Sequence, residues 1–173
     1  MISAVVAVDE NYGIGSNNEL LVHIPEDMKN FKRLTTNNVV IMGRKTYDSL
    51  PNKPLPNRTN IVVSSNIDGN LSFEVKKDGA IFIRLDYIKK TLEHFSKCSL
   101  PFDVYIIGGG TIYKELLPYC ENVYMTKIHN AYSNVDTYFP NIEKTNEWEL
   151  EMSSDTRKHN ETKYQFCVYK RKK

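Results

Sequence analysis

Two adjacent acidic residues, Glu26 and Asp27, have the chemistry and the position to serve in a binding or catalytic site. They follow Pro25, and proline favours the first turn of a helix. Met28 and Phe31 continue the segment at helical spacing, so Asp27 lies beside an apolar stripe. A carboxylate in that place can hold a cationic or amidine-like group, or take part in proton transfer. Acidic residues in a first turn also simply complement the helix dipole, and the spacing does not decide which of the two faces inward.

Two predicted strand-to-helix turns carry glycine where the chain passes from one element to the next. The first lies within Ile41–Thr46 and the second within Ile107–Tyr113. Glycine lets a phosphate group approach the backbone closely, and the helix start that follows attracts anions. One such turn often has glycine for geometry alone. Two in a chain of this length indicate a ligand with several phosphates, such as a dinucleotide.

The residues near these turns favour NADPH over NADH. The glycines 108–110 are consecutive, and no acidic residue follows at the spacing of the Rossmann fingerprint. Arg44 and Lys45 follow the first turn, and Ser64 and Ser65 end the next predicted strand. Cations and hydroxyls of this kind suit a 2′-phosphate. The alternative is that Arg44 and Lys45 are ordinary exposed side chains.

Length and composition predict one domain without nucleic-acid, membrane or metal chemistry. The chain has 173 residues, enough for one core without disulfides, and a formal net charge of +2. Its 3 cysteines and 4 histidines are dispersed, which predicts reduced thiols and no metal site. The N-terminal apolar stretch is too short for a signal peptide, and no run reaches membrane-spanning length. We therefore expect a cytoplasmic protein.

The elements that must position these residues alternate between strands and helices. Short apolar runs predict strands at 2–8, 38–42, 61–64, 81–83, 104–107 and 123–128, with an edge strand around 73–75 and a final hairpin at 148–152 and 164–169. Helices are predicted at 25–34, 44–50, 86–95 and 111–117, and a mobile loop at 11–18. The alternation lasts until about residue 118, which predicts an α/β fold with a largely parallel sheet and antiparallel strands at its C-terminal end.

Taken together, the motifs resemble those of the dihydrofolate reductase family. No single motif is decisive, but the ordered set spans essentially the whole chain: Ile14-Gly15, Pro25-Glu26-Asp27, Phe31-Lys32, Ile41 to Tyr47, Leu55 to Arg58, Ile107 to Gly110 and Asp136 to Pro140. The resemblance implies a single domain over 1–173, with an adenosine-binding subdomain at roughly 39–100. It also implies a mostly parallel sheet of about eight strands, an antiparallel C-terminal strand and about four flanking helices.

The same resemblance implies an activity in one-carbon metabolism. NADPH would transfer a hydride to the pterin of 7,8-dihydrofolate, the adjacent ring nitrogen would be protonated, and tetrahydrofolate would form. Asp27 and Thr126 would be the catalytic pair, and the loop 11–22 would close over the site and exclude water. The protein would be a monomer that also binds antifolate inhibitors.

The implied binding residues form two sets. Substrate would contact Val5, Met28, Phe31, Lys32, Leu50, Leu55, Arg58 and Ile107, with Arg58 pairing with the glutamate carboxylate. The cofactor would contact Ala7, Ile14, Gly15, Gly43, Arg44, Lys45, Thr46, Ser64, Ser65, Gly108, Gly109, Gly110, Thr111 and Tyr113. The Gly108–Gly109 bond would be a cis peptide, which glycine tolerates best.

Two other functions fit parts of this pattern. One is a related NADPH-dependent reductase acting on another heterocycle, such as a pyrimidine reductase, although those proteins lack the pairing of Asp27 with Arg58. The other is a non-catalytic folate- or dinucleotide-binding protein. It is suggested by a departure from the family pattern, because Leu20-Leu21-Val22 stands where the family usually has Leu-Pro-Trp. Valine cannot donate the hydrogen bond that an indole N–H provides, and His23 is not expected to replace that donor.

Replacing Val22 tests how much this departure costs. Losing one such contact should remove about 1 to 3 kcal/mol of transition-state stabilisation. Val22→Trp should therefore raise turnover or tighten substrate binding in steady-state kinetics. Unchanged kinetics would mean that the rest of the site already compensates for the missing indole.

Overall fold

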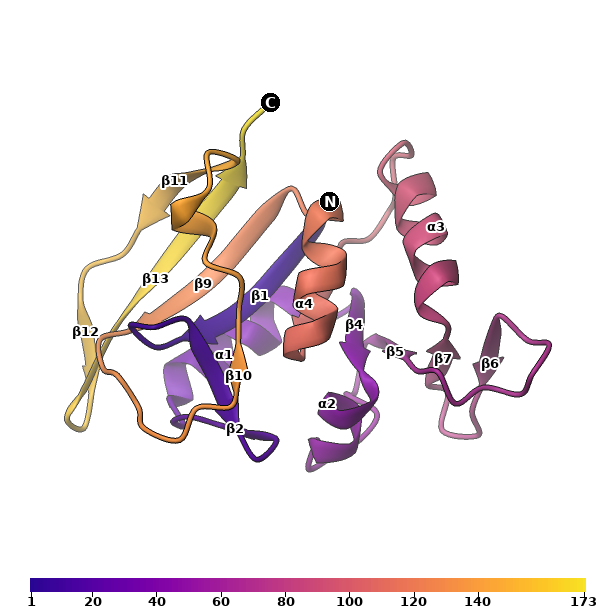
Figure 1. Ribbon diagram of the computed structural model, residues 1–173, viewed down its shortest axis with the longest axis horizontal. Coiled ribbons are helices and arrows are strands. Elements are labelled where there is room, and N and C mark those ends of the chain that lie inside the picture. Colours follow the sequence, from indigo (N-terminus) through magenta and orange to yellow (C-terminus); the bar gives the residue numbers. More distant parts are fainter.

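A mostly parallel ten-stranded sheet forms the centre of the protein (Figure 1). The computed structural model describes all residues from Met1 to Lys173. The strands of this sheet are β1 (Ile2–Val8), β4 (Val39–Gly43), β5 (Thr59–Val63), β6 (Phe73–Val75), β7 (Ile81–Ile83), β8 (Val104–Gly108), β9 (Asn122–Ile128), β11 (Trp148–Ser153), β12 (Arg157–His159) and β13 (Thr162–Arg171). The order is β11-β13-β9-β1-β8-β4-β5-β7-β6, and β12 pairs with β13.

The predicted parallel sheet with antiparallel additions is confirmed. All neighbours from β9 through β1, β8, β4 and β5 to β7 run parallel. The antiparallel pairs involve β13 on one side of the sheet and β6 on the other. The sheet has more strands than the expected eight, partly because β12 forms within the polar loop predicted between the strands of the final hairpin. β13 is 10 residues long, so it can pair with β12, β11 and β9.

Four α-helices cover the two faces of the sheet. They are α1 (Pro25–Thr35), α2 (Arg44–Ser49), α3 (Leu85–Phe95) and α4 (Gly110–Leu116), and two short 3-10 helices follow, η1 (Leu117–Tyr119) and η2 (Ile142–Lys144). All four predicted helices are present, with ends shifted by a residue or so, as fraying helix ends allow. Figure 1 shows α4 in front of β1 and α1 behind it.

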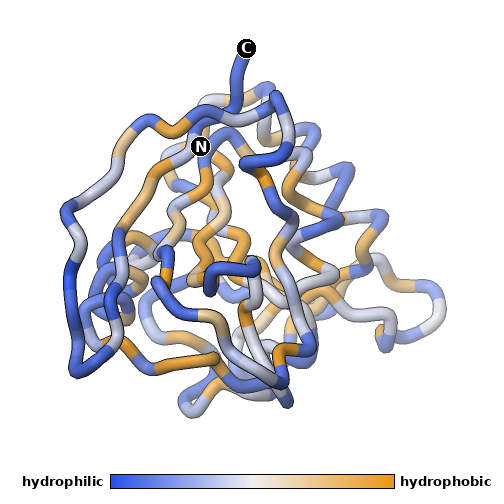
Figure 2. The backbone as a smooth tube through the Cα atoms, turned by 60° about the vertical axis from the view of Figure 1, so that its left-hand side comes forward, coloured by the Kyte–Doolittle hydropathy of each residue, from blue (hydrophilic) through white to orange (hydrophobic).

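Alternation along β1 divides the core into two layers. Ile2, Ala4, Val6 and Val8 belong to the large buried cluster that also contains residues of α3 and α4. Val5 points to the other face, where it packs near a second cluster with residues of α2 and α1. This is the period of two that a strand imposes. The apolar segments coloured orange in Figure 2 concentrate in these central strands, while the C-terminal end is hydrophilic.

The prediction of an unstructured loop at 11–18 is wrong in part. β2 (Gly13–Ser16) and β3 (Glu19–Leu20) form a small antiparallel sheet with β10 (Thr137–Tyr138). The buried Asp9 carboxylate accepts hydrogen bonds from the backbone N–H groups of Asn11 (2.9 Å) and Gly13 (2.7 Å) and so shapes the turn into β2. The partner strand β10 lies more than a hundred residues away in sequence, so local composition did not reveal the pairing.

Glu143 on η2 ties three parts of the fold together. Its carboxylate accepts hydrogen bonds from the hydroxyls of Tyr12 and Tyr169, both at 2.6 Å, and pairs with the Lys127 ammonium. Partial burial alone would raise the pKa of Glu143, but the Lys127, Tyr12 and Tyr169 contacts outweigh it and hold the pKa at about 2. The end of the β1–β2 loop is thereby fastened to β9 and β13.

This network predicts how stability changes in acid. A carboxyl group with a depressed folded-state pKa stabilises the native state above its unfolded pKa, and that contribution is lost as pH falls through the folded value. Glu143→Gln should therefore be less stable than the parent near neutral pH, and the difference should shrink between pH 4.5 and about 2. Urea unfolding at a series of pH values measures this. Glu149→Gln, at an exposed carboxylate in no ion pair, is the control and should shift little. A difference that does not depend on pH would contradict this account of Glu143.

Candidate active site

The carboxylate of Asp27 meets the central sheet at Thr126. The Thr126 hydroxyl donates a hydrogen bond of 2.6 Å to Asp27 Oδ1, and it comes from the middle of β9. Asp27 lies in the first turn of α1, which begins at Pro25 after an extended Ile24. The Ile24 side chain is buried with Ile128 and Tyr164, so the start of the helix is anchored to the sheet. The structure thus brings the predicted catalytic pair together.

Glu26 has a different role from Asp27. Its carboxylate pairs with the Arg157 guanidinium and accepts a hydrogen bond of 2.5 Å from the Tyr164 hydroxyl. These partners belong to β12 and β13, so Glu26 holds α1 against the C-terminal hairpin. The sequence left open which of the two acids faces the site. The structure answers this: Asp27 contacts a central strand of the sheet, and Glu26 already has a cationic partner.

The surroundings of Asp27 favour its protonated form. Burial raises the pKa of its carboxyl above the usual range, and the hydrogen bond from Thr126 and the nearby charge of His23 oppose that rise without cancelling it. The fully buried Tyr113 is near enough for Asp27 to raise its pKa further, after the larger effect of burial. A carboxyl group that holds its proton to higher pH than usual is suited to proton transfer.

Arg58 lies at the opposite end of α1. Its guanidinium donates to the Thr35 hydroxyl at 3.1 Å and to the Pro56 carbonyl at 2.9 Å, which fixes it beside the last turn of the helix. Partial burial lowers the pKa of Arg58, but the group stays cationic. At 1.5 Å per residue, the first and last turns of this helix are about 12 Å apart. A molecule that lies along α1 therefore meets a carboxylate at one end and a cation at the other.

Apolar side chains separate these two charges. Four of the predicted substrate residues gather around the second buried cluster, on the face of the sheet that carries α1: Val5, Leu50, Leu55 and Ile107. Phe31 is half-buried on α1, while Met28 is 38% exposed and Lys32 is exposed. Phe31, Met28 and Lys32 therefore lie on the side of α1 that is open to solvent, outside the buried cluster.

The two predicted glycine turns lie side by side. β4 and β8 are parallel neighbours, and the register pairs Met42 with Gly108, so Gly43 and Gly109 follow at the same edge of the sheet. A Cβ on Gly43 would lie 3.0 Å from Ile112, and one on Gly110 would lie 2.7 Å from the Thr137 methyl. The Gly108–Gly109 bond is cis, as expected, and Gly108 has φ +122°. Glycine avoids the close contacts at Gly43 and Gly110 and permits the positive φ of Gly108, and a backbone without side chains can be approached closely by a ligand.

Tyr113 connects the glycine turn to β1. Its hydroxyl donates a hydrogen bond of 2.6 Å to the Val5 carbonyl, and its ring stacks edge-on against Phe139 at 4.9 Å. A Cβ on Gly108 would lie 3.2 Å from this ring, so the tyrosine also requires the glycine. Val5, Tyr113 and Gly108 therefore form one continuous wall next to Asp27.

Most of the residues predicted to bind the 2′-phosphate are exposed. Ser64 is buried at the end of β5, and its hydroxyl accepts from the Asn66 N–H at 3.1 Å, whereas Ser65 is exposed. Arg44 is exposed, and its Nε lies 3.2 Å from Asp48, while its guanidinium stacks over Phe82 at 5.2 Å. The remaining predicted cofactor residues on α2 and α4 are Lys45, Thr46 and Thr111, of which Lys45 and Thr111 are exposed.

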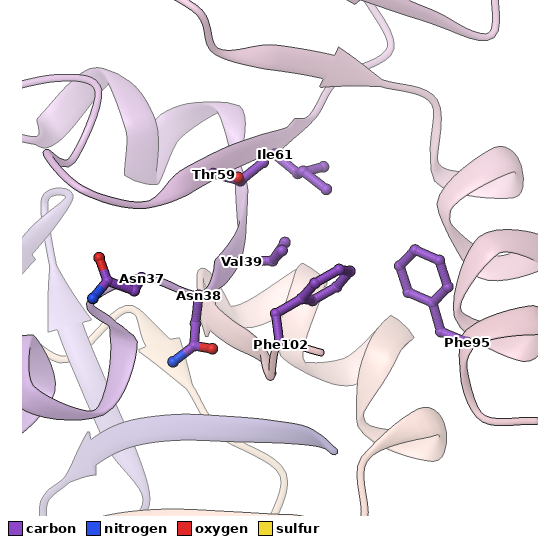
Figure 3. Close-up of a pocket in the computed structure, with 7 residues that line it drawn as sticks. All are labelled: Asn37, Asn38, Val39, Thr59, Ile61, Phe95 and Phe102. Carbon is purple, nitrogen blue, oxygen red and sulfur yellow. The ribbon is translucent and has the colours of Figure 1, made fainter. Parts of the chain in front are cut away.

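The pocket drawn in Figure 3 lies elsewhere. It has a volume of about 330 Å³ and is lined by Asn37, Asn38, Val39, Thr59, Ile61, Phe95 and Phe102 (Figure 3). Val39 and Thr59 begin β4 and β5, so this pocket opens at the end of the sheet opposite the glycine turns. No residue predicted for substrate or cofactor lines it.

Comparison with known proteins agrees with this geometry. The sequence model of a family described as dihydrofolate reductase matches residues 1–171. The dihydrofolate reductase of Bacillus subtilis is 37% identical over 174 residues, covering 99% of this chain and 95% of that protein. That of Schistosoma mansoni is 38% identical, covering 97% of this chain and 95% of that protein. The chain belongs to the dihydrofolate reductase family.

A solved structure of a dihydrofolate reductase extends the likeness to the fold. The enzyme from Enterococcus faecalis, complexed with NADP(H) and RAB-propyl, superposes with a TM-score of 0.82 at 31% identity. The alignment covers 100% of this chain and 97% of that one. The predicted dihydrofolate reductase fold, in one domain, is confirmed.

Sequence reasoning assigned no role to Asp136, which holds the loop beside the site. Its backbone N–H donates to the Gly15 carbonyl at 3.1 Å, and its carboxylate accepts from the Asn17 N–H at 2.9 Å. The Asn17 N–H and the Thr137 hydroxyl lower the pKa of the Asp136 carboxyl. The family resemblance did include the segment Asp136 to Pro140. The spacing of residues could not predict, however, that Asp136 would bond to Asn17 in the loop.

Val22 lies where the dihydrofolate reductase pattern usually has tryptophan. Its side chain packs against the apolar cluster of Ile24, Ile128 and Tyr164, near Ala7. It therefore helps to anchor the start of α1 but provides no donor. His23 is exposed, yet its charge acts on Asp27.

Removing the Asp27 carboxylate should disable proton transfer while leaving the fold intact. Asp27→Asn is expected to slow dihydrofolate reduction at least about 100-fold near neutral pH, the lower end of the usual contribution of a general acid or base. In the parent, turnover should fall as pH rises above the pKa of Asp27, because the protonated form is lost; the variant should lack that dependence. Steady-state rates across pH measure both effects.

Glu26→Gln is the matched control, since Glu26 is the neighbouring acid with a structural partner. It should keep the parental pH profile. A parental rate in Asp27→Asn together with a slow Glu26→Gln would move the catalytic role to Glu26.

Proposed function

We propose that the chain reduces 7,8-dihydrofolate to 5,6,7,8-tetrahydrofolate with NADPH. The observation that carries this proposal is the arrangement along α1, with the Asp27–Thr126 pair at one end and Arg58 at the other. A folate has a pterin ring with an amino group and ring N–H at one end and a glutamate carboxylate at the other. The family membership of the chain supports the same reaction.

Asp27 would bind and orient the pterin. Its carboxylate can accept hydrogen bonds from the pterin amino group and ring N–H, while Thr126 holds the second side of the carboxyl group in place. The raised pKa keeps a proton available near the substrate, and we propose that this proton reaches the ring nitrogen through water. The Val5 and Ile107 carbonyls would face the ring, and Leu50, Leu55, Met28 and Phe31 would enclose its apolar parts.

Arg58 and Lys32 would bind the glutamate end. The planar guanidinium of Arg58 presents parallel N–H donors that match a carboxylate. Its contacts with Thr35 and Pro56 hold it in position before the substrate arrives. Less conformational entropy is therefore lost on binding.

The glycine edge fits NADPH, which supplies the hydride when bound. Two glycine turns end the parallel neighbours β4 and β8 at the same edge of the sheet, and this pairing is the observation that supports a dinucleotide there. Arg44, Lys45, Thr46, Thr111, Ser64 and Ser65 would hold the phosphates, and Ala7, Ile14, Gly15 and Tyr113 would surround the nicotinamide. The subdomain at roughly residues 39–100 would hold the adenosine.

We propose further that the protein acts as a cytoplasmic monomer and binds antifolates in the Asp27 cleft. None of its helices is long and apolar enough to cross a membrane. All three cysteines, Cys98, Cys120 and Cys167, are unpaired, which suits a reducing compartment. Sedimentation with NADPH and methotrexate tests both the monomer and the inhibitor binding.

A change at Arg58 tests the substrate assignment. Arg58→Gln should raise the KM for dihydrofolate about 10- to 100-fold with little change in kcat, because a charge-assisted bidentate contact is lost before chemistry begins. NADPH oxidation followed by absorbance measures both constants. A dihydropterin without the glutamate tail should be reduced equally well by parent and variant. Equal losses for both substrates would contradict the assignment of Arg58, and absence of any dihydrofolate-dependent oxidation in the parent would contradict the proposed function.

A further inference from the structure

A second cavity, of about 520 Å³, lies between α1 and the C-terminal side of the sheet. Four α1 residues line it, at positions i, i+3, i+4 and i+7: Glu26, Lys29, Asn30 and Arg33. This spacing places them on one face of the helix. The α1 residues assigned to substrate begin at Met28 and lie on the opposite face, because successive residues are turned by about 100°. The cavity is therefore separate from the substrate cleft, with Asp27 at the boundary between the two.

The floor of this cavity is apolar and flat. Register places Val5, Tyr124 and Val168 side by side across β1, β9 and β13, with Phe166 in the next row. Residues between them, such as Met125, belong to the core cluster on the other side of the sheet. Four adjacent side chains thus offer rings and branched methyl groups to the cavity.

The roof of the cavity does not complement this floor. A helix normally packs an apolar stripe against its sheet, but here the facing residues are charged or polar. The Arg157 guanidinium lies over the Phe166 ring at 5.5 Å, and the space above Tyr124 and Val168 remains open to the cavity. Water in such a place contacts apolar surface that a ligand would cover more favourably.

The charges around the cavity leave a positive excess. Glu26 is already paired with Arg157 and bonded to Tyr164. Lys29 and Arg33 take part in no ion pair, and the Arg33 guanidinium donates a hydrogen bond of 2.7 Å to the Asn30 side chain. Two cations are therefore free to bind an anion at the edge of an apolar floor.

We propose that this cavity is a second ligand site, which binds a small aromatic carboxylate. The ring lies on Tyr124 and Val168, beside the Phe166 ring that Arg157 covers, and the carboxylate lies between Lys29 and Arg33. The volume is within the 300–1,000 Å³ usual for small-molecule sites. This inference is independent of the proposed reduction, because only Val5 and Thr126 are shared with the active site.

Titration with 2-naphthoate tests the site directly. The probe is added to the full-length, ¹⁵N-labelled protein, first alone and then with saturating NADPH and methotrexate. We expect saturable binding in both conditions, with amide shifts centred on Lys29, Arg33, Tyr124 and Phe166. Loss of binding when NADPH and methotrexate are present would overturn the proposal, because the probe would then be occupying the substrate cleft.

Charge variants test the recognition. The double variant Lys29→Gln/Arg33→Gln should weaken 2-naphthoate binding at least about tenfold, since two charge-assisted contacts are lost. The matched control Lys90→Gln/Lys97→Gln removes two exposed cations at α3 and its C-terminal end, and should leave the affinity unchanged. Equal affinity in parent and cavity variant would refute the site, as would equal binding of the neutral 2-naphthamide.

Filling the cavity tests its shape and keeps both cations in the chain, although it removes the amide oxygen that accepts from Arg33. Asn30→Trp should place a ring over Tyr124 and Val168 and abolish 2-naphthoate binding, while dihydrofolate reduction continues. Undiminished binding in a folded Asn30→Trp protein would show that the probe lies elsewhere. If that variant does not fold, the charge variants and the neutral analogue still decide the question.

Discussion

The hydrogen bond between Thr126 and Asp27 is the constraint on which the site depends. A carboxyl group taken out of water needs a partner, and the nearest one comes from a strand 99 residues later in the chain. The bond can form only if β9 lies next to β1 in the observed register and α1 lies across the same face. The parallel order of the central strands is therefore what places an acidic residue of a first helical turn in a partly buried site where it can hold a proton. Thr126 also lines the second cavity beneath α1, so the active site and that cavity share this residue.

A second constraint acts at the same edge of the sheet, on the neighbouring strands β8 and β4. β8 and β4 are adjacent, and the register shift after Ile41 brings Gly108 opposite Met42. Tyr113 then reaches back to the Val5 carbonyl from the helix that follows. The glycine edge and the Asp27 carboxyl are in this way joined through β1, so a reacting pair of molecules would be oriented by one rigid unit and not by separate loops.

Much of this could be predicted from the sequence, and the failures share one physical cause. Strands such as β1 and β8 and all four helices were recognisable because their apolar periodicity is local. The strand at 13–16 was missed because its pairing with β10 is not local, and the strand at 19–20 was missed because its pairing with 13–16 is very short. Spacing could not separate Asp27 from Glu26, since the partners of Glu26 come more than 130 residues later. The face of α1 that carries Lys29 and Arg33 is polar, as an exposed helix face usually is. Composition alone therefore did not predict the cavity beneath it.

The central position of β1 affects how the chain folds as it is synthesised. β1 precedes its two neighbours in the sheet, β8 and β9, by about 100 residues or more, so it leaves the ribosome well before they do. Until they emerge, the run Ile2–Val8 cannot complete its backbone pairing and stays exposed to other chains. Contacts of such long sequence separation also make folding slow. The strand that joins the glycine edge to the Asp27 side of the site is therefore also a segment that stays unpaired until most of the chain has been made.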